Sequence, residues 1–393
     1  MSGGTGENSG ASPTRVLFTG YAGVHFACFK PLYEKLRDDE RFDVFVSGGL
    51  RSKVDGVHQY DLHGMYDQFD IPADRRLTVE QIRGESFDYL FASNTKMIAP
   101  MDVRVRVQIF HGVSFRNKAV REANAHADVY FLIGPYMQRA FSTTEILRED
   151  DPRVLPIGFM KTDRMLNGQL DRTELLNLYG FMGDRPVVLY APTGQKHNSL
   201  ETMGEAVLRS LKESDRFDII VKAHDHPKNK SIDWFVRLGP MEDEHLCVTR
   251  DVDVIPLLFL ADLLITDASS VSSEYSLLDR PMVFLDVPKL LAKARRGVGS
   301  MLDLETWGRR CGDLVTDPAE IVTTVSEALE EPQRHASIRR AMAEDLFFNR
   351  GSATESAWRW LNEHRVQLRP AAHAAHAVGD AGSRAPDASA VPT

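Results

Sequence analysis

The sequence predicts an α/β protein with two doubly wound domains that face each other across a cleft. Short apolar runs typical of buried strands alternate with helical patterns, and this alternation indicates parallel sheets. The alternation restarts after a break near Asp171–Asp184, so the 393 residues divide into two halves of similar length. Each half is large enough for a domain of ordinary size. Ligands of such folds bind at the carboxyl ends of the strands, so we expect the site in the cleft.

Both halves follow a strand–helix order. The first half opens on the apolar run Arg15–Thr19, which ends at a glycine turn and is followed by a helical pattern. The other strands predicted in this half are Phe42–Ser47, Tyr89–Ala92, Arg104–Phe110 and Val129–Ile133. The strands predicted in the second half are Pro186–Ala191, Phe217–Ala223, Leu263–Thr266 and Met282–Leu285. The helices predicted there are Leu200–Ser214, Pro256–Ala261, Ala319–Glu330 and Ser337–Glu363.

These elements predict the domain boundaries. We expect an N-terminal domain over residues 15–170 and a C-terminal domain over residues 171–336. The helices predicted over residues 337–368 could return to the N-terminal domain. Residues 1–14 are rich in Gly and Ser, and residues 369–393 are rich in Ala, Pro, Gly and Ser, so both are predicted to be disordered.

The composition indicates a globular, cytoplasmic protein. Hydrophobic residues make up 43% and charged residues 26% of the chain, and the net charge of −9 argues against nucleic acid as a partner bound through bulk charge. The N-terminus lacks the apolar segment of a signal peptide, and the longest apolar run, Ile255–Ala261, is too short to span a bilayer. The three widely spaced cysteines indicate a reducing compartment. Any membrane contact would be peripheral.

The most informative segment is Asp251–Pro288, where a helix, a buried strand, a polar loop, a second helix and a second strand follow one another. Its loop places Asp267, Ser269, Ser270 and Glu274 where the second helix begins. Free amides at a helix N-terminus favour an anion, and serine hydroxyls add donors. Such a loop after a parallel strand holds phosphate groups in many α/β proteins. The alternative is an ordinary N-cap, for which Ser and Asp are the usual residues.

A histidine follows the predicted strand Arg104–Phe110 at its carboxyl end. His111 can act as a general base because the ordinary pKa of histidine lies near neutrality. Gly112 lets the backbone turn or approach a ligand, and Arg116 and Lys118 add positive charge nearby. The alternative is a structural histidine that caps or hydrogen-bonds the backbone.

Two strand ends in the second half also carry polar loops. Lys222, His224 and His226 belong to a stretch with three lysines in nine residues, a cationic rim suited to a diphosphate. The alternative for the lysines is a solvated loop. The His-x-His pair also suggests a metal site, but no further ligands stand at helpful spacing, so no metal ligand is predicted. Thr193 and the Gly194 amide could meet a ligand or form a plain turn.

Taken together, these segments resemble the CDP-glycerol glycerophosphotransferase family, the enzymes that build the poly(glycerol phosphate) of teichoic acids. The resemblance is one of motif order and runs from about Arg104 to Leu285. The segments that carry it are His111–Phe115 with Lys118, Gly158–Asp163, Tyr190–Thr193, Lys222 with His224 or with His226-Pro227, and Pro256–Pro281, of which the last is the specific one. The chain departs from the family pattern at Val113-Ser114, Ala268 and Ser273-Glu274, which puts the choice of substrate in question.

The resemblance implies a GT-B-like fold with two Rossmann-like domains, the first facing the acceptor and the second binding the nucleotide donor. It implies transfer of glycerol phosphate, or a related phosphoalditol, from CDP-glycerol or a similar CDP-alditol to a hydroxyl of a lipid-linked or surface-glycan acceptor, with release of CMP. The enzyme would dock at the inner face of the cell membrane. No cofactor is assigned, and a divalent cation remains open.

The resemblance also implies roles for the site residues. His111 would be the base, His224 or His226 would hold the diphosphate and one of them could protonate the leaving group, and Ser269 and Ser270 would bind donor phosphates. The other candidate donor-binding residues are Gly112, Lys118, Thr193, Lys222, Asp267 and Glu274.

Two alternative functions stay open at this point. A GT-B glycosyltransferase or a UDP-sugar epimerase would hold a sugar nucleotide in the same cleft, with Glu274 on a sugar or ribose hydroxyl. A non-catalytic nucleotide-binding protein would bind the ligand without the chemistry. The convergence of basic and hydroxyl groups favours an enzyme.

Overall fold

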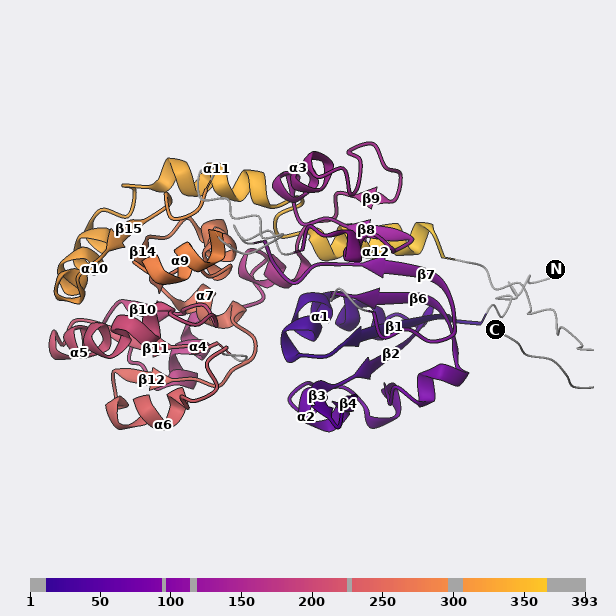
Figure 1. Ribbon diagram of the computed structural model, residues 1–393, viewed down its shortest axis with the longest axis horizontal. Helices are drawn as coiled ribbons and strands as arrows, with labels where there is room; N and C mark the ends of the chain where they lie inside the picture. The colour runs from indigo at the N-terminus through magenta and orange to yellow at the C-terminus, as the bar shows by residue number, and fades with distance from the viewer. Residues whose placement is uncertain (1–11, 94–96, 114–118, 225–227, 296–306, 366–393) are drawn as a thin grey trace, which may run out of the picture.

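The protein has two α/β domains side by side, each with a parallel sheet covered by helices (Figure 1). The computed structural model describes residues 12–93, 97–113, 119–224, 228–295 and 307–365. The predicted fold class is therefore confirmed. Residues 369–393 and most of residues 1–14, predicted as disordered, lie outside the described residues. No helix in the described part of the chain is both long and apolar enough to cross a bilayer.

The first domain contains a seven-stranded parallel sheet with the order β5-β2-β1-β6-β7-β8-β9. Its strands are β1 (Thr14–Gly20), β2 (Phe42–Gly48), β5 (Arg76–Leu77), β6 (Ser86–Ala92), β7 (Asp102–Gln108), β8 (Val129–Phe131) and β9 (Val154–Leu155). All five predicted strands lie in the interior of this sheet. Strands β1, β2 and β6 are buried on both faces and read as nearly continuous apolar runs, whereas β7 alternates exposed and buried residues at its start. The edge strands β5 and β9, of two residues each, are too short to give such a pattern.

Helices and a small hairpin complete the first domain. Its helices are α1 (Gly23–Arg37), α2 (Leu62–Tyr66) and α3 (Pro135–Thr143), with 3-10 turns η1 (Ala73–Arg75), η2 (Gln81–Gly84), η3 (Glu122–Asn124) and η4 (Met160–Met165). An antiparallel hairpin of β3 (Leu50–Val54) and β4 (Val57–Asp61) was not predicted, because its mostly exposed side chains give no alternating apolar pattern.

The second domain contains a six-stranded parallel sheet with the order β12-β11-β10-β13-β14-β15. Its strands are β10 (Val187–Tyr190), β11 (Asp218–Val221), β12 (Leu246–Val248), β13 (Leu263–Thr266), β14 (Met282–Leu285) and β15 (Asp313–Val315). Its helices are α4 (Arg172–Tyr179), α5 (Glu205–Glu213), α6 (Trp234–Leu238), α7 (Ile255–Leu260), α8 (Val271–Tyr275), α9 (Pro288–Arg295) and α10 (Ile321–Glu330). Shorter turns are η5 (Leu200–Gly204), η6 (Gly239–Met241), η7 (Ser276–Leu278) and η8 (Pro318–Glu320). The predicted helix Leu200–Ser214 thus begins with the π-helical turn η5.

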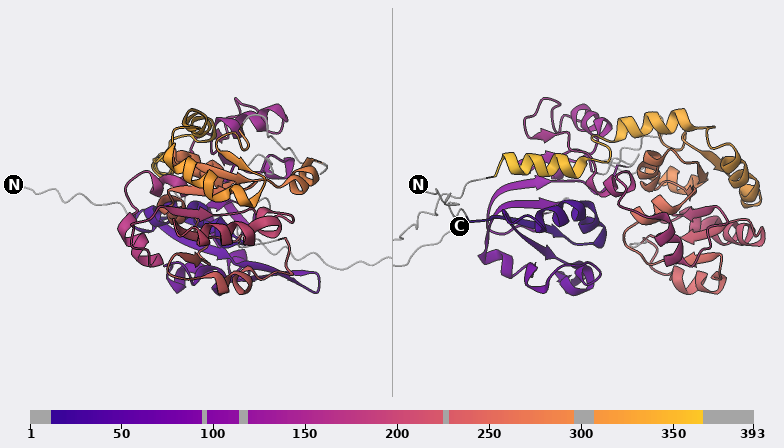
Figure 2. Two further views of the ribbon diagram at one scale, coloured as in Figure 1. Left: turned by 90° about the vertical axis from the view of Figure 1, so that its left-hand side faces the viewer. Right: turned by 180° about the vertical axis from the view of Figure 1, so that it is seen from behind.

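The C-terminal helical pattern forms two helices rather than one continuous helix. They are α11 (Ala336–Leu346) and α12 (Ala353–Glu363). Asn349 and Gly351 between them adopt left-handed φ angles of 42° and 77°, which interrupt a right-handed helix. Helix α11 packs against α3 of the first domain and α8 of the second, whereas α12 packs against α1 (Figures 1 and 2). The last two helices therefore connect the second domain back to the first.

The family-like segment Gly158–Asp163 anchors this returning chain. Gly158 has a φ of +100°, and a Cβ atom there would lie 2.4 Å from the carbonyl oxygen of Phe348. The Asp163 carboxylate accepts hydrogen bonds from the backbone N–H groups of Ala353 (3.1 Å) and Thr354 (2.7 Å), which satisfies the first turn of α12. Both residues at the ends of this segment thus have a structural purpose.

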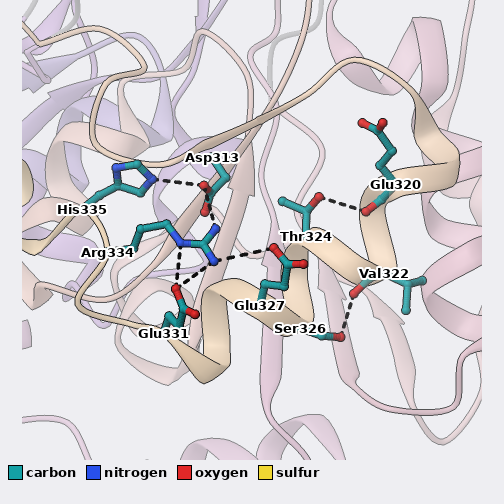
Figure 3. A network of polar contacts seen from close by, with 9 residues as sticks. All are labelled: Asp313, Glu320, Val322, Thr324, Ser326, Glu327, Glu331, Arg334 and His335. Atoms are coloured by element: carbon teal, nitrogen blue, oxygen red, sulfur yellow. Dashed lines mark hydrogen bonds and ion pairs between the residues drawn. The ribbon is translucent and has the colours of Figure 1, made fainter.

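A surface network fixes the start of α11 to the edge of the second sheet. Arg334 donates to Asp313 on β15 (3.2 Å) and to Glu331 (3.0 Å), and His335 Nε2 lies 3.1 Å from the same Asp313 carboxylate (Figure 3). The connection between α10 and α11 is therefore held where the chain leaves the second sheet.

Candidate functional site

A cleft of about 450 Å³ lies between the two domains at the carboxyl ends of their strands. We call it the interdomain cleft. It brings together six predicted site residues, His111 from the first domain and, from the second, Lys222, His224, Ser269, Ser270 and Glu274. The structure therefore places these six residues together, because strand ends of the two parallel sheets meet at this cleft.

The hydrogen bond of His111 determines which ring nitrogen is available for chemistry. Its Nδ1 lies 3.0 Å from the carbonyl oxygen of Ser93, at the end of β6. Because a carbonyl oxygen only accepts, Nδ1 carries the hydrogen and the neutral ring keeps a lone pair on Nε2. This is the tautomer that a general base requires.

The surroundings of His111 also favour its neutral form. His111 is an exposed residue that lines the interdomain cleft. Desolvation by the protein atoms around the ring lowers the pKa of His111, the hydrogen bond to Ser93 opposes the shift, and the positive charge of Lys161 adds to it. At neutral pH His111 is therefore unprotonated and able to accept a proton.

A second imidazole, which sequence reasoning missed, lines the cleft beside His111. His25 of α1 is 4% exposed, and its ring centroid lies 5.5 Å from that of His111. Its Nδ1 accepts a hydrogen bond from the backbone N–H of Tyr21 (3.1 Å), so Nε2 carries the hydrogen in the neutral ring. The sequence signal that could have identified His25 is its position just after the glycine turn that ends β1, because this turn is another strand end at the cleft.

A buried ion pair joins the two domains at the wall of the cleft. Lys161 Nζ on η4 lies 3.1 Å from Glu274 Oε2 on α8, and the two side chains are 4% and 3% exposed. Burial lowers the pKa of the Lys161 ammonium, but the charge and hydrogen bond of Glu274 together with Cys28 and Asp253 raise it more, so Lys161 stays charged. Sequence reasoning gave Lys161 no role, because nothing in the chain indicates a partner 113 residues away.

Asp267 lies behind the cleft, where it connects two loops. Its fully buried carboxylate accepts hydrogen bonds at 2.9 Å from the backbone N–H groups of Thr193 and Ser199 and from the Ser199 hydroxyl. These bonds tie the loop after β10 to the loop after β13. Neither Thr193 nor Asp267 lines the interdomain cleft.

The capping alternative does not account for Ser270. This residue occupies the N-cap position of α8, but its side chain makes no capping hydrogen bond. A Cβ atom on Gly112 would lie 3.6 Å from Ser270 Oγ and 3.9 Å from Glu274 Oε1. The backbone at Gly112 therefore lies close to the start of α8 in the second domain.

A close backbone approach also positions His224. A Cβ atom on Gly194 would lie 2.7 Å from the His224 ring, so a glycine is required there. Lys222 Nζ donates to the Ala223 carbonyl oxygen (3.1 Å) in the same strand end. The other predicted site residues, Lys118 and His226, lie outside the described residues. Within the described ranges, no three His, Cys, Asp or Glu side chains gather in a way that could hold a metal ion.

Comparison with protein families decides where this chain belongs. The model of the CDP-glycerol:poly(glycerophosphate) glycerophosphotransferase family matches residues 87–358. The chain belongs to this family. The match includes His111, the second-domain side of the interdomain cleft, helix α11 and the first half of α12, so it extends beyond the segments from which the resemblance was recognised.

Curated relatives support the same assignment. The chain is 26% identical to the teichoic acid ribitol-phosphate primase of Bacillus spizizenii over 282 residues, which cover 65% of this chain and 68% of that protein. It is 30% identical to the teichoic acid glycerol-phosphate primase of Bacillus subtilis over 169 residues, which cover 42% of this chain and 41% of the relative. The second of these alignments thus spans less than half of the relative.

Solved structures show the same fold. A histidine variant of the wall teichoic acid polymerase TagF, soaked with CDPG, superposes with a TM-score of 0.67 at 17% identity and covers 90% of this chain and 89% of the other. UDP-GlcNAc 2-epimerase from Neisseria meningitidis superposes with a TM-score of 0.55 at 12% identity and covers 90% of this chain and 100% of the other. At these sequence identities both comparisons show a shared fold and nothing further.

Proposed function

We propose that this protein transfers glycerol phosphate from CDP-glycerol to a hydroxyl group of an acceptor and releases CMP. The observation that supports the proposal most is the meeting, in one cleft, of His111 in its base tautomer with Lys222, His224, Ser269 and Ser270. Membership of the glycerophosphotransferase family supports CDP-glycerol as the donor.

The reaction needs a base on one side of the phosphorus and charge stabilisation on the other. His111 Nε2 accepts the proton of the acceptor hydroxyl while the hydroxyl oxygen attacks the phosphorus of the glycerol phosphate group. The bond from this phosphorus to the bridging oxygen breaks, and CMP leaves with the electron pair. His224 stands on the opposite domain, where it can hold the diphosphate and donate a proton to the leaving phosphate.

The second domain supplies the groups for the donor phosphates. The hydroxyls of Ser269 and Ser270 donate hydrogen bonds, and the ammonium of Lys222 neutralises charge on the diphosphate. Asp267 acts indirectly, because its hydrogen bonds hold the two loops that carry Thr193 and the serines. Glu274 also acts indirectly by keeping Lys161 charged at the wall of the cleft.

The acceptor and location complete the proposal. We infer a lipid-linked or surface-glycan acceptor at the inner face of the cell membrane, because the relatives are named as teichoic acid primases and polymerases. The proposal takes glycerol rather than ribitol as the alditol of the donor, because the family description names CDP-glycerol. A sugar-nucleotide reaction has only the shared fold in its favour.

Thermal-shift ranking tests the donor. A ligand that binds only the folded state raises the melting temperature, and at equal concentrations the ligand with the higher affinity raises it more. We expect CDP-glycerol to raise it more than CDP-ribitol, and both more than UDP-GlcNAc. A larger shift with UDP-GlcNAc would favour the glycosyltransferase or epimerase alternative, and CDP-glycerol binding without any CMP release would favour a non-catalytic protein.

A further inference from the structure

Two glycine turns of the first domain bring the β3–β4 hairpin to the interdomain cleft. Gly48, the last residue of β2, and Gly49 have positive φ angles of 99° and 141°. A Cβ atom on Gly48 would lie 2.0 Å from the carbonyl oxygen of Gly20, the last residue of β1, so this approach requires glycine. The hairpin therefore begins directly beside the turn that carries Tyr21.

Arg51 of this hairpin is held against the turn. Its guanidinium lies over the Tyr21 ring, with Cζ 3.8 Å from the ring centroid, and its backbone N–H donates to the Tyr21 carbonyl oxygen (3.3 Å). The Tyr21 and His25 rings meet edge to face with centroids 4.4 Å apart, and His25 lies 5.5 Å from His111. All four residues line the interdomain cleft, so Arg51 extends the wall that carries the proposed base.

The charges around the cleft favour an anionic ligand that touches both domains. Among the described residues that line it, Lys, Arg, Asp and Glu are represented by Arg51, Lys161, Lys222, Lys228 and Glu274. Glu274 pairs with Lys161, so the cleft keeps an excess of positive charge in a chain whose net charge is −9. The exposed Arg51 guanidinium makes no ion pair with the described part of the chain. Stacking holds its plane and leaves the N–H groups at its edge, which is the geometry that binds a phosphate through two parallel hydrogen bonds.

We propose that Arg51 binds, from the first domain, the phosphate of the donor that carries glycerol. This inference rests on the proposed function, since it takes CDP-glycerol as the ligand of the interdomain cleft. Lys222 and Lys228 neutralise the diphosphate from the second domain. In the transfer step this phosphate separates from CMP and departs on the acceptor, so CMP no longer carries the group that Arg51 binds. Arg51 therefore adds to the affinity for the donor and not to that for CMP, which favours release of the product.

Calorimetry in the absence of acceptor compares CDP-glycerol with CMP on the same variants. Arg51→Met keeps an apolar stem over Tyr21 but removes the charge. We expect it to weaken CDP-glycerol binding by about 10- to 100-fold, the range for a lost charge-assisted hydrogen bond, and to leave CMP binding unchanged. Arg51→Lys keeps the charge without the planar fork, so its CDP-glycerol affinity should be intermediate. Tyr21→Leu removes the stacking ring and should weaken CDP-glycerol binding by about twofold to fivefold.

Lys53→Met is the matched control. Lys53 is exposed on the same strand, two residues beyond Arg51, but does not line the interdomain cleft, so both affinities should stay unchanged. Both residues are exposed on a surface hairpin, so these variants should melt like the unmodified protein. Unaltered CDP-glycerol affinity in Arg51→Met, or an equal loss of CMP affinity, would overturn the role of Arg51. Failure of the unmodified protein to bind CDP-glycerol, or to release CMP from it when a membrane extract supplies the acceptor, would instead refute the proposed function.

Discussion

Removing the ammonium of Lys161 should destabilise the protein strongly. The Lys161→Met variant keeps the apolar stem but leaves the Glu274 carboxylate, 3% exposed, without its partner 3.1 Å away. Breaking a buried ion pair from one side costs about 3–5 kcal/mol, because an uncompensated charge stays buried. For domains of this size each kcal/mol lowers the melting temperature by about 2–4 °C, so we expect a fall of roughly 6–20 °C.

The stability lost in the Lys161→Met variant should depend on pH, and the pKa of Glu274 determines whether the loss grows or shrinks as pH rises. Burial raises the pKa of Glu274, and the Lys161 charge holds that shift back. Without Lys161, the pKa of Glu274 in the folded state rises further above its unfolded value. A raised carboxyl pKa means that the folded state binds the proton more tightly, so stability falls as pH rises through that pKa. Lys161→Met should therefore be less damaging at pH 5 than at pH 8.

Melting curves of three variants and the unmodified protein measure the effect. The double variant Lys161→Met/Glu274→Met removes both charges and should recover most of the lost stability. Arg148→Met, which breaks a pair whose side chains are 81% and 72% exposed, is the matched control and should not change the melting temperature. If Lys161→Met melts like the control, or if the double variant is as unstable as the single one, the reasoning is refuted.

Further predictions concern the base, the loops and the returning helix. His111→Ala should lower CMP release by about 100-fold or more while CDP-glycerol still binds, and retained turnover would exclude His111 as the base. Because the pKa of His111 is lowered, the acid limb of the rate profile should lie below about pH 6.5, and Lys161→Met should move it to higher pH. Gly194→Ala should displace the His224 ring and slow turnover by about 10- to 100-fold without unfolding the protein; an unchanged rate would mean that this ring position is unimportant. Asp163→Ala removes the hydrogen bonds that start α12 and should cost about 1–2 kcal/mol in denaturant unfolding, and a cost near zero would contradict the capping role.

The sequence predicts those parts of the site that depend on local pattern. His111 follows a strand of the first sheet, and Lys222, His224 and the Ser269-Ser270 pair follow strands of the second. Each is therefore predicted at the carboxyl edge of its own sheet, and they meet because these two edges face the same cleft. Strands such as β1, β2 and β6 are predictable because burial on both faces leaves nearly continuous apolar runs.

The sequence does not show which residues far apart in the chain contact each other in the fold. In the sequence Lys161 and Glu274 are ordinary charged residues, and only the fold shows that they lie 3.1 Å apart. Asp267 is predicted to bind phosphate, but in the fold its carboxylate accepts hydrogen bonds from three groups of a distant loop. His25 is one of the buried residues of α1, so only its position just after the glycine turn that ends β1 indicates a place at the cleft. These residues depend on contacts between segments far apart in the chain.

Product analysis tests the central claim most directly. The protein is incubated with CDP-glycerol and a membrane extract, and mass spectrometry identifies the products, with the His111→Ala variant in parallel. We predict stoichiometric CMP and an acceptor heavier by one or more glycerol phosphate units, both lost or greatly reduced in the variant. An unmodified acceptor with intact CDP-glycerol, or equal product from the variant, would contradict transfer by His111 in the interdomain cleft.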